Sequence, residues 1–308
     1  MKNLGYSTWH TTCDTLHMVM QMMGKIKLRK MSPQPEWKHS LLQITARGFS
    51  TGLIPDGDHS FEISIDILNG MVDIMSTNGV NATFELHDGV SVSGYYADLM
   101  GALGYVGHPV VINVTPQEFH SATPFTEQTR RVDFDHAAAR NFFMQNVFAR
   151  NALLDFAAPY RGKKICPSLF WGSFDMTTVL FSGVEKKFPG TGVIEESAFD
   201  EQFIEFGFWP GDPNEDDPTF FVMAYPFLKG ELDMSGVSVE NALYSPEKAE
   251  CFLKLKDALA TPDPQSTVVR FCQETFAAIS KQEKWGNVDW FTKPLLSGET
   301  SQAIAREA

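Results

Sequence analysis

An alternation of apolar and polar side chains between positions 61 and 67 restricts the fold more than any other feature of the chain. The apolar side chains are at every second position from Phe61 to Ile67, as expected for a strand with one buried face. Asn69-Gly70 and Asn78-Gly79 follow, and both dipeptides tolerate the positive φ angles of tight hairpin turns. Residues 61–87 therefore predict an antiparallel meander of three strands.

Segments with the residue pattern of helices lie before and after this meander. Residues 11–23 have apolar side chains at helical spacing, and Gly24 is expected to end that helix. Further helices are predicted at 91–103, at about 135–156 with an aspartate cap, and from Ser245-Pro246 and Asp263-Pro264 onward. Further strands are predicted at 41–54, 110–114, 168–181, 206–209 and 220–227.

Each half of the chain thus consists of a helix, several strands and another helix. This order predicts an α+β fold in which antiparallel sheets are flanked by helices. We interpret it as two halves, residues 1–115 and 116–295, which are compatible with two α-β-α pseudo-repeats packed into one body. Residues 296–308 are expected to form a frayed tail.

The charge of the chain restricts its partners. Lys and Arg number 25 against 38 Asp and Glu, so the formal net charge is −13. Such a protein is repelled by phosphate backbones and anionic lipids. We therefore expect neither nucleic acid nor membrane as a partner, and a small-molecule substrate or ligand instead. The oligomeric state is not accessible from the sequence.

Cysteine usage and hydropathy bear on location. The four cysteines are widely spaced and contain no CxxC pair, which is typical of reduced thiols. No apolar leader and no apolar run of membrane-spanning length is visible. These features predict a cytoplasmic protein.

Polar residues form a narrow stripe on the first predicted helix. They fall within an arc of roughly 80° at about 100° per residue and comprise His10, Asp14, His17, Gln21 and Lys25. The stripe faces either solvent or an internal polar pocket, and the sequence leaves both open. The first three residues have a spacing compatible with metal ligation, but the glutamate of a HExxH helix is missing. We therefore predict no metal site.

Two segments combine large aromatic residues with glycine: residues 170–175 (Phe-Trp-Gly-Ser-Phe-Asp) and 207–211 (Gly-Phe-Trp-Pro-Gly). Such segments either line a ligand pocket, with Ser173 and Asp175 as polar groups, or pack in the core. The chain contains no GxGxxG, Walker or GxSxG motif. No cofactor is predicted.

Several short motifs follow one another along most of the chain. They are Trp9, Thr15-Leu16-His17, Gln21, Gly24-Lys25, Thr45-Ala46-Arg47-Gly48, Phe61-Glu62-Ile63, Trp171-Gly172-Ser173-Phe174-Asp175, Ser182-Gly183, Gly207-Phe208-Trp209-Pro210-Gly211 and Ala224-Tyr225-Pro226. With these motifs the chain resembles the largely bacterial proteins grouped as domain of unknown function 5996. The resemblance groups these residues but implies no activity.

The chain departs from that family pattern at two places. A histidine usually stands two residues before the Phe-Trp-Gly motif, where this chain has Ser168. A Ser-His-Glu usually precedes the Gly-Phe-Trp-Pro-Gly motif, where this chain has Asp200-Glu201-Gln202. The resemblance implies that any function of those histidines is lost or altered here.

Two hypotheses follow for the function. The first is a small-molecule enzyme, a lyase, isomerase, cyclase or hydrolase, that uses cofactor-independent acid–base chemistry between the two halves. Its site residues would be His17 for proton transfer, Asp175 or Glu201 as partner carboxylate, and Gln21, Lys25, Arg47, Trp171, Ser173, Trp209 and Tyr225 for substrate binding. The second is a protein that binds a ligand or partner without turnover.

Overall fold

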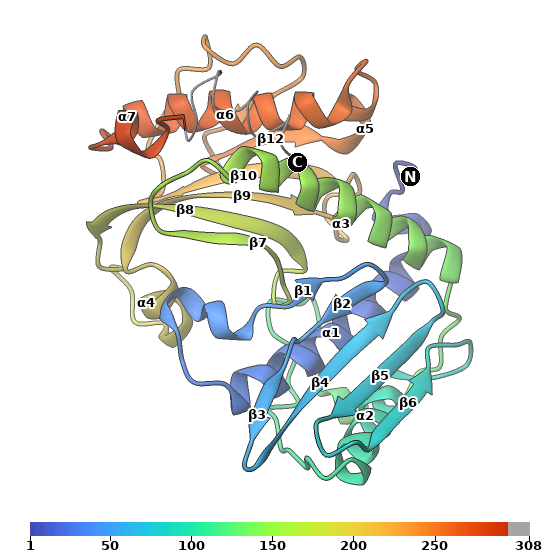
Figure 1. Cartoon of the computed structure of the whole chain (residues 1–308). Helices are drawn as coiled ribbons and strands as arrows, with labels where there is room; N and C mark the ends of the chain where they lie inside the picture. The colour runs from blue at the N-terminus through green and yellow to red at the C-terminus, as the bar shows by residue number, and fades with distance from the viewer. Residues whose placement is uncertain (295–308) are drawn as a thin grey trace, which may run out of the picture.

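The computed structural model describes residues 1–294; the predicted frayed tail at 296–308 lies outside them. Within the described residues the chain forms helices and two antiparallel sheets, which confirms the predicted α+β class. In Figure 1 the helices α3 and α6 lie above one sheet, and the other sheet lies below with α1 and α2 behind it. No helix among the described residues has the length and apolar character needed to cross a membrane.

The first sheet is built from residues 43–85. Its strands are β1 (Gln43–Ile44), β2 (Gly48–Ser50), β3 (Ile54–Asp56), β4 (His59–Asp66), β5 (Met71–Ser76) and β6 (Asn81–Glu85). The order is β1-β2-β4-β5-β6, and β3 pairs with β4. The predicted meander is therefore confirmed as β4-β5-β6, and Gly70 and Gly79 have the positive φ that its two turns require.

Helix α1 (His10–Lys30) is largely buried behind this sheet, beside α2 (Val92–Tyr105), which Ser91 caps. The prediction that Gly24 ends α1 is wrong, because the helix continues to Lys30. A Cβ atom at position 24 would collide with the indole ring of Trp171. Gly24 therefore permits close packing of Trp171 on the helix backbone, a tertiary reason that propensity does not encode.

The second sheet is built from residues 164–254. Its order is β11-β12-β10-β9-β8-β7. The strands are β7 (Lys164–Phe170), β8 (Asp175–Glu185), β9 (Glu201–Trp209), β10 (Thr219–Tyr225), β11 (Leu243–Ser245) and β12 (Glu250–Lys254). Short helices connect or flank them: η1 (Tyr6–Thr8), η2 (Pro35–Ser40), η3 (Phe125–Glu127), α4 (Val193–Ala198), α5 (Leu255–Leu259) and α7 (Val288–Phe291).

Two long helices cover one face of the second sheet. They are α3 (His136–Ala157), capped by Asp135, and α6 (Pro264–Gln282), capped by Asp263. Phe206 on β9 packs 4.5 Å from Phe156 of α3, measured between ring centroids. On the opposite face of the sheet, side chains line a cavity together with residues of η2, α4 and Gln117-Glu118.

Two predicted strands are divided in the structure. The predicted strand 41–54 is split among β1, β2 and β3, and the predicted strand 168–181 spans the hairpin of β7 and β8 with its turn at residues 171–174. Two further predicted elements are wrong. Residues 110–114 are not paired in a sheet. The helix predicted from Ser245-Pro246 is the turn of a hairpin, because Ser245 on β11 pairs with Glu250 on β12. Proline fixes a φ angle that suits the first turn of a helix and a tight turn equally well, so the dipeptide alone does not separate the two.

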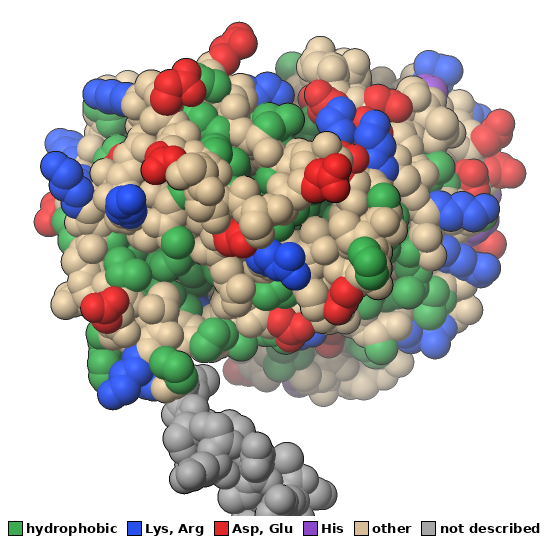
Figure 2. Space-filling model, turned by 90° about the horizontal axis from the view of Figure 1, so that it is seen from above, with side chains coloured by type: hydrophobic (Ala, Val, Ile, Leu, Met, Phe, Trp, Pro, Cys, Tyr) green, Lys and Arg blue, Asp and Glu red, His purple; other side chains and the backbone are tan. Residues whose placement is uncertain are grey.

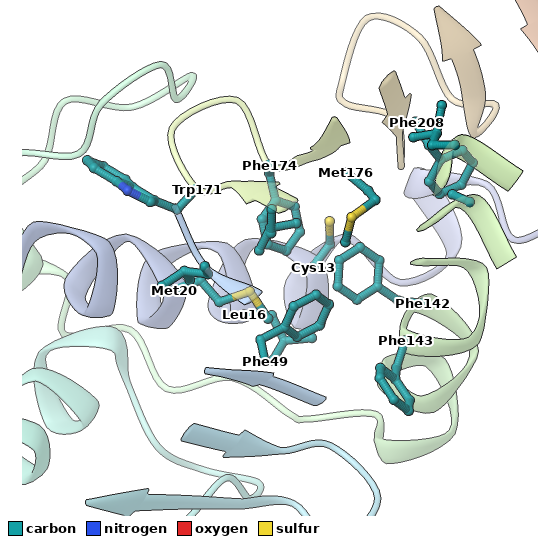
Figure 3. Packing of buried hydrophobic residues seen from close by; sticks show 14 of the residues in the cluster. Cys13, Leu16, Met20, Phe49, Phe142, Phe143, Trp171, Phe174, Met176 and Phe208 are labelled. Carbon is teal, nitrogen blue, oxygen red and sulfur yellow. The ribbon is translucent and has the colours of Figure 1, made fainter. Parts of the chain in front are cut away.

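One hydrophobic core extends through both halves of the chain. Figure 3 shows Phe174 and Met176 of the second half pointing toward Cys13 and Leu16 of α1, with Phe142 of α3 beside them. The rings of Phe174 and Phe142 are stacked at 5.0 Å. Side chains of α1 thus pack against core residues from both halves of the chain. These contacts hold residues 171–176 against α1. Whether the two halves are pseudo-repeats stays a prediction.

Replacing Gly24 with alanine is expected to destabilise the protein by about 1–3 kcal/mol, since the new methyl group must displace a buried indole ring. Gly101 in α2 is the matched control, because a Cβ there meets no atom within 4 Å. Gly101→Ala is expected to stabilise by about 0.5–1 kcal/mol through helix propensity. Chemical denaturation of both variants checks the opposite signs.

Candidate functional site

A groove lies on the open face of the second sheet, at the junction of the two halves. It consists of a cavity of about 510 Å³ and a second one of about 480 Å³. Both are lined by Ser173, Asp175, Phe221 and Glu250. The first cavity is also lined by residues of η2 and by Gln117-Glu118, which belong to the segment between α2 and α3. We call the two cavities together the acidic groove.

The first cavity is lined by aromatic rings and by carboxyl groups, with no lysine or arginine among its described lining residues. The carboxyl groups belong to Glu36, Glu118, Asp175, Glu205 and Glu250. Glu36 forms an ion pair with Lys163. The other four have no ion pair within the described part of the chain. The cavity therefore carries uncompensated acidic groups.

Asp175 is the most deeply placed of these acids, with 2% of its surface exposed. The Thr177 hydroxyl donates to Oδ2, whereas Oδ1 has no hydrogen-bond partner among the described residues. Burial raises the pKa of Asp175 to about 6, and the charge of Glu118 adds to this increase. The nearby hydroxyls of Ser173 and Thr177 favour the carboxylate, although Ser173 forms no hydrogen bond of normal geometry with it.

Glu205 and Glu250 flank the same site from β9 and β12. Both lie opposite Met223 of the strand between them, so they are at the same level of the sheet. Burial raises the pKa of Glu205 well above its ordinary value, and the charges of Asp175, Glu250 and Glu118 add to that. Burial also raises the pKa of Glu250, which Lys248 partly opposes. The pKa values of these neighbouring acids are therefore raised together, chiefly by burial.

His17 holds the segment that precedes Asp175. Its Nε2 atom is 3.0 Å from the carbonyl oxygens of both Trp171 and Gly172 and also 3.0 Å from the amide nitrogen of Gln21. Because the two carbonyl oxygens can only accept, we place the proton on Nε2, which donates to them. The ring stacks on Phe174 at 4.4 Å. Phe174 has a φ of 65°, an unfavourable value for a large side chain, and the stack retains it there. Burial lowers the pKa of His17 to about 4.

Gln21 and Lys25 lie next to His17 on the same face of α1. The Gln21 amide accepts from the Gln117 N–H at 2.8 Å and donates to the Gln117 carbonyl at 2.6 Å, and it thereby fixes the loop above the first cavity. The Nζ atom of Lys25 is 5.8 Å from the centre of the Trp171 ring, and burial lowers its pKa. The inner part of the polar stripe thus faces the protein interior, and only its His10 end is exposed.

Comparison with family models decides the relationship that the motifs indicated. The model of a family of unknown function, DUF5996, matches residues 1–290. The chain belongs to this family. No curated protein and no solved structure matches the chain. In this DUF5996 member, the family motifs around His17, Gln21, Gly24 and 171–175 are therefore in mutual contact, since Trp171 packs on Gly24 and His17 binds the 171–172 backbone.

Seven of the ten predicted site residues lie at the groove or directly beneath it. Trp171, Ser173 and Asp175 line the first cavity, and Trp209 lines the second together with Ser173 and Asp175. His17, Gln21 and Lys25 lie beneath these residues and are not among the groove-lining side chains. The sequence thus indicated both the wall of the groove and the buried layer that supports it.

Three predicted residues lie elsewhere. Arg47 is exposed on the first sheet, where it pairs with Asp66. Glu201 pairs with Lys163 and accepts the Gly183 N–H at 2.8 Å. Tyr225 packs in an aromatic cluster, 5.1 Å from Phe199. The structure therefore does not bring Arg47, Glu201 or Tyr225 together with Asp175 at the acidic groove.

Glu205 and Glu250 were missed by the sequence reasoning. A signal existed in the alternation of β9, where Phe203, Glu205, Gly207 and Trp209 lie on one face. A carboxylate at such a position normally indicates a solvated face, and only the pairing of β9 with its neighbours shows that this face lines a cavity. Among the described residues, no three His, Cys, Asp or Glu side chains are arranged to hold a metal ion.

Proposed function

We propose that this protein is a small-molecule enzyme that performs acid–base chemistry with carboxyl groups in the acidic groove, without a cofactor. One observation carries the proposal: Asp175 is buried, has a free carboxyl oxygen and lines both cavities. A buried titratable group at the centre of a pocket of this size is the usual mark of an active site.

The carboxyl groups have complementary protonation states. The pKa of Asp175, about 6, lets it act as a base near neutral pH and regain a proton readily. Burial and the neighbouring carboxyl groups raise the pKa of Glu205 as well, and we propose Glu205 as the group that donates a proton. Trp171 and Phe221 line the same cavity as this pair.

His17 has a different role from the one expected from the sequence. Its Nε2 proton is bound to two backbone carbonyls, and a pKa of about 4 keeps the ring neutral. We therefore propose that His17 is a positioning residue, which holds the 171–174 turn and through it the carboxyl of Asp175. The same engagement of His17 favours the alternative function, a protein that binds its ligand without turnover.

The enzyme proposal is tested with a small-molecule extract from cells, incubated with the protein and followed by mass spectrometry. We expect the wild-type protein to deplete at least one compound and form a product, and Asp175→Asn to lose about 100-fold or more of that rate. Asp73→Asn, at a half-buried position on β5 of the other sheet, is the matched control and is expected to retain activity. A compound that binds but is recovered unchanged would support the binding protein instead.

The four cysteines support one further part of the proposal. None of them is in a disulfide, and Cys13, Cys251 and Cys272 are buried. Free buried thiols are common in proteins of reducing compartments. We propose residence in the cytoplasm.

We also propose that nucleic acid is not a partner of this protein. In Figure 2 acidic and basic side chains are mixed over the face viewed there, and no single basic patch forms on that face.

A further inference from the structure

We propose that the substrate or ligand is a cation, an ammonium group attached to an apolar or aromatic body, whose charged end binds between Asp175, Glu205 and Glu250. This inference rests on the proposed function in that it concerns the same groove. It adds the chemical class of the molecule that the groove accepts.

The first argument is charge balance. Glu118, Asp175, Glu205 and Glu250 line the first cavity without an ion-pair partner among the described residues. Carboxylates in an apolar cavity lose hydration, and a positive charge placed among them compensates that cost. The lysines of the groove are confined to the second cavity. There Lys254 is bound to Glu215 and Asp217, and Lys248 lies over the Phe252 ring at 5.3 Å.

The second argument is hydrogen bonding. Asp175 Oδ1 is a buried acceptor with no donor within the described residues. A buried polar atom without a partner is costly, by about 1–3 kcal/mol or more when charged. An ammonium group supplies N–H donors only and therefore fits an unpaired carboxylate oxygen, whereas a carboxylate or phosphate group supplies none.

The third argument concerns the rest of the ligand. Phe170, Trp171 and Phe221 line the first cavity, and aromatic faces attract cations in addition to packing against apolar groups. Gly207 lies below Phe221, and a Cβ atom there would collide with that ring and with Thr177. The missing side chain thus leaves room for the Phe221 ring over the backbone of Gly207, in the same cavity as Asp175 and Glu250.

Binding of a cation is then coupled to proton release. The acids that face one another here are Glu118, Asp175, Glu205 and Glu250, and Lys248 is the basic group that acts on them. The pKa values of Asp175, Glu205 and Glu250 are all raised, so these groups hold protons more readily than exposed carboxyl groups do. A bound ammonium favours the ionised forms and displaces protons. Affinity is therefore expected to increase as the pH rises from about 5 to about 8.

The test compares three probes of similar size: 2-phenylethylamine, 2-phenylethanol and 3-phenylpropanoate. Titration calorimetry near pH 7.5 is expected to show that the amine binds about tenfold or more tightly than the alcohol, and that the carboxylate does not bind. Repeating the amine titration in buffers of different ionisation enthalpy is expected to reveal released protons. Equal affinity for amine and alcohol, preference for the carboxylate, or absence of amine binding overturns the proposal.

Variants locate the binding. Asp175→Asn and Glu250→Gln are each expected to weaken the amine about tenfold or more and to leave the alcohol unchanged, whereas Asp73→Asn changes neither. Thermal melts establish that each variant is folded. If Asp175→Asn does not fold, the affinity of Glu250→Gln for the amine tests the position of the site. Amine binding that is unaffected in a folded variant of either acid contradicts the assigned position.

The two proposals fail separately. The calorimetric test needs no turnover, so amine selectivity together with an inert extract assay would retain the cation site and reject the enzyme. Conversely, an Asp175-dependent conversion of an uncharged compound, with no preference for the amine probe, would retain the enzyme and reject the cation site.

Discussion

Replacing His17 with alanine is expected to lower the free energy of unfolding by about 3 kcal/mol. The ring is 7% exposed, stacks on Phe174, and donates to the carbonyl oxygens of Trp171 and Gly172. Alanine leaves a cavity and two acceptors without their donor. Urea denaturation near pH 7.5 measures the loss. His10→Ala, at an exposed position of the same helix, is the control and should change stability by less than about 0.5 kcal/mol.

The stability deficit of His17→Ala should also depend on pH. The folded pKa of His17 is about 4, below the ordinary value of about 6.5. The unfolded chain therefore binds more protons between these values, and the histidine destabilises the wild type increasingly as the pH falls through this window. The deficit is expected to shrink by about 2–3 kcal/mol on acidification from about pH 7 to about pH 4. A deficit that stays constant would show that the ring is protonated in the folded protein.

Replacing Asp175 with asparagine is expected to raise the free energy of unfolding by about 2 kcal/mol near pH 7.5. The folded pKa of Asp175, about 6, is higher than that of an unfolded aspartate, about 3.9. The protonated side chain is thus favoured by folding, and this stability is present below about pH 4 and lost as the pH rises through about 6. Asparagine remains uncharged and avoids the loss.

Denaturation curves at about pH 4 and about pH 7.5 check this sign. The variant and the wild type should differ little at the lower pH and diverge at the higher one. Asp73→Asn, on the other sheet, should show no such divergence. A variant that is less stable than the wild type at the higher pH would mean that the Asp175 carboxylate stabilises the fold, which would contradict its assignment as a site residue. A gain in stability with a loss of binding is typical of functional positions.

Local patterns predicted many of the elements. The alternation at 61–67 and two Asn-Gly turns specified β4, β5 and β6, because a strand with one buried face has a period of two. The aspartates at 133 and 135 and the Asp263-Pro264 pair indicated the starts of α3 and α6, and in the structure the side chains of Asp135 and Asp263 accept the first free backbone N–H groups of those helices. Gly24 and Ser245-Pro246 led to wrong predictions. Gly24 packs against Trp171, which is distant in the sequence, and Ser245 pairs with Glu250 on the neighbouring strand.

The sequence by itself determined the α+β class, the meander and the capped helices, and the family motifs in it indicated that His17 and Gln21 belong with the 171–175 segment. Only the tertiary structure decided that His17 supports the groove from beneath, that Arg47 and Glu201 lie apart from Asp175, and that Glu205 and Glu250 join it. The physical reason is that side-chain periodicity reports which face of an element is buried. Which carboxyl groups share a cavity depends on the pairing of β8, β9, β10 and β12 and on the loop packed above them.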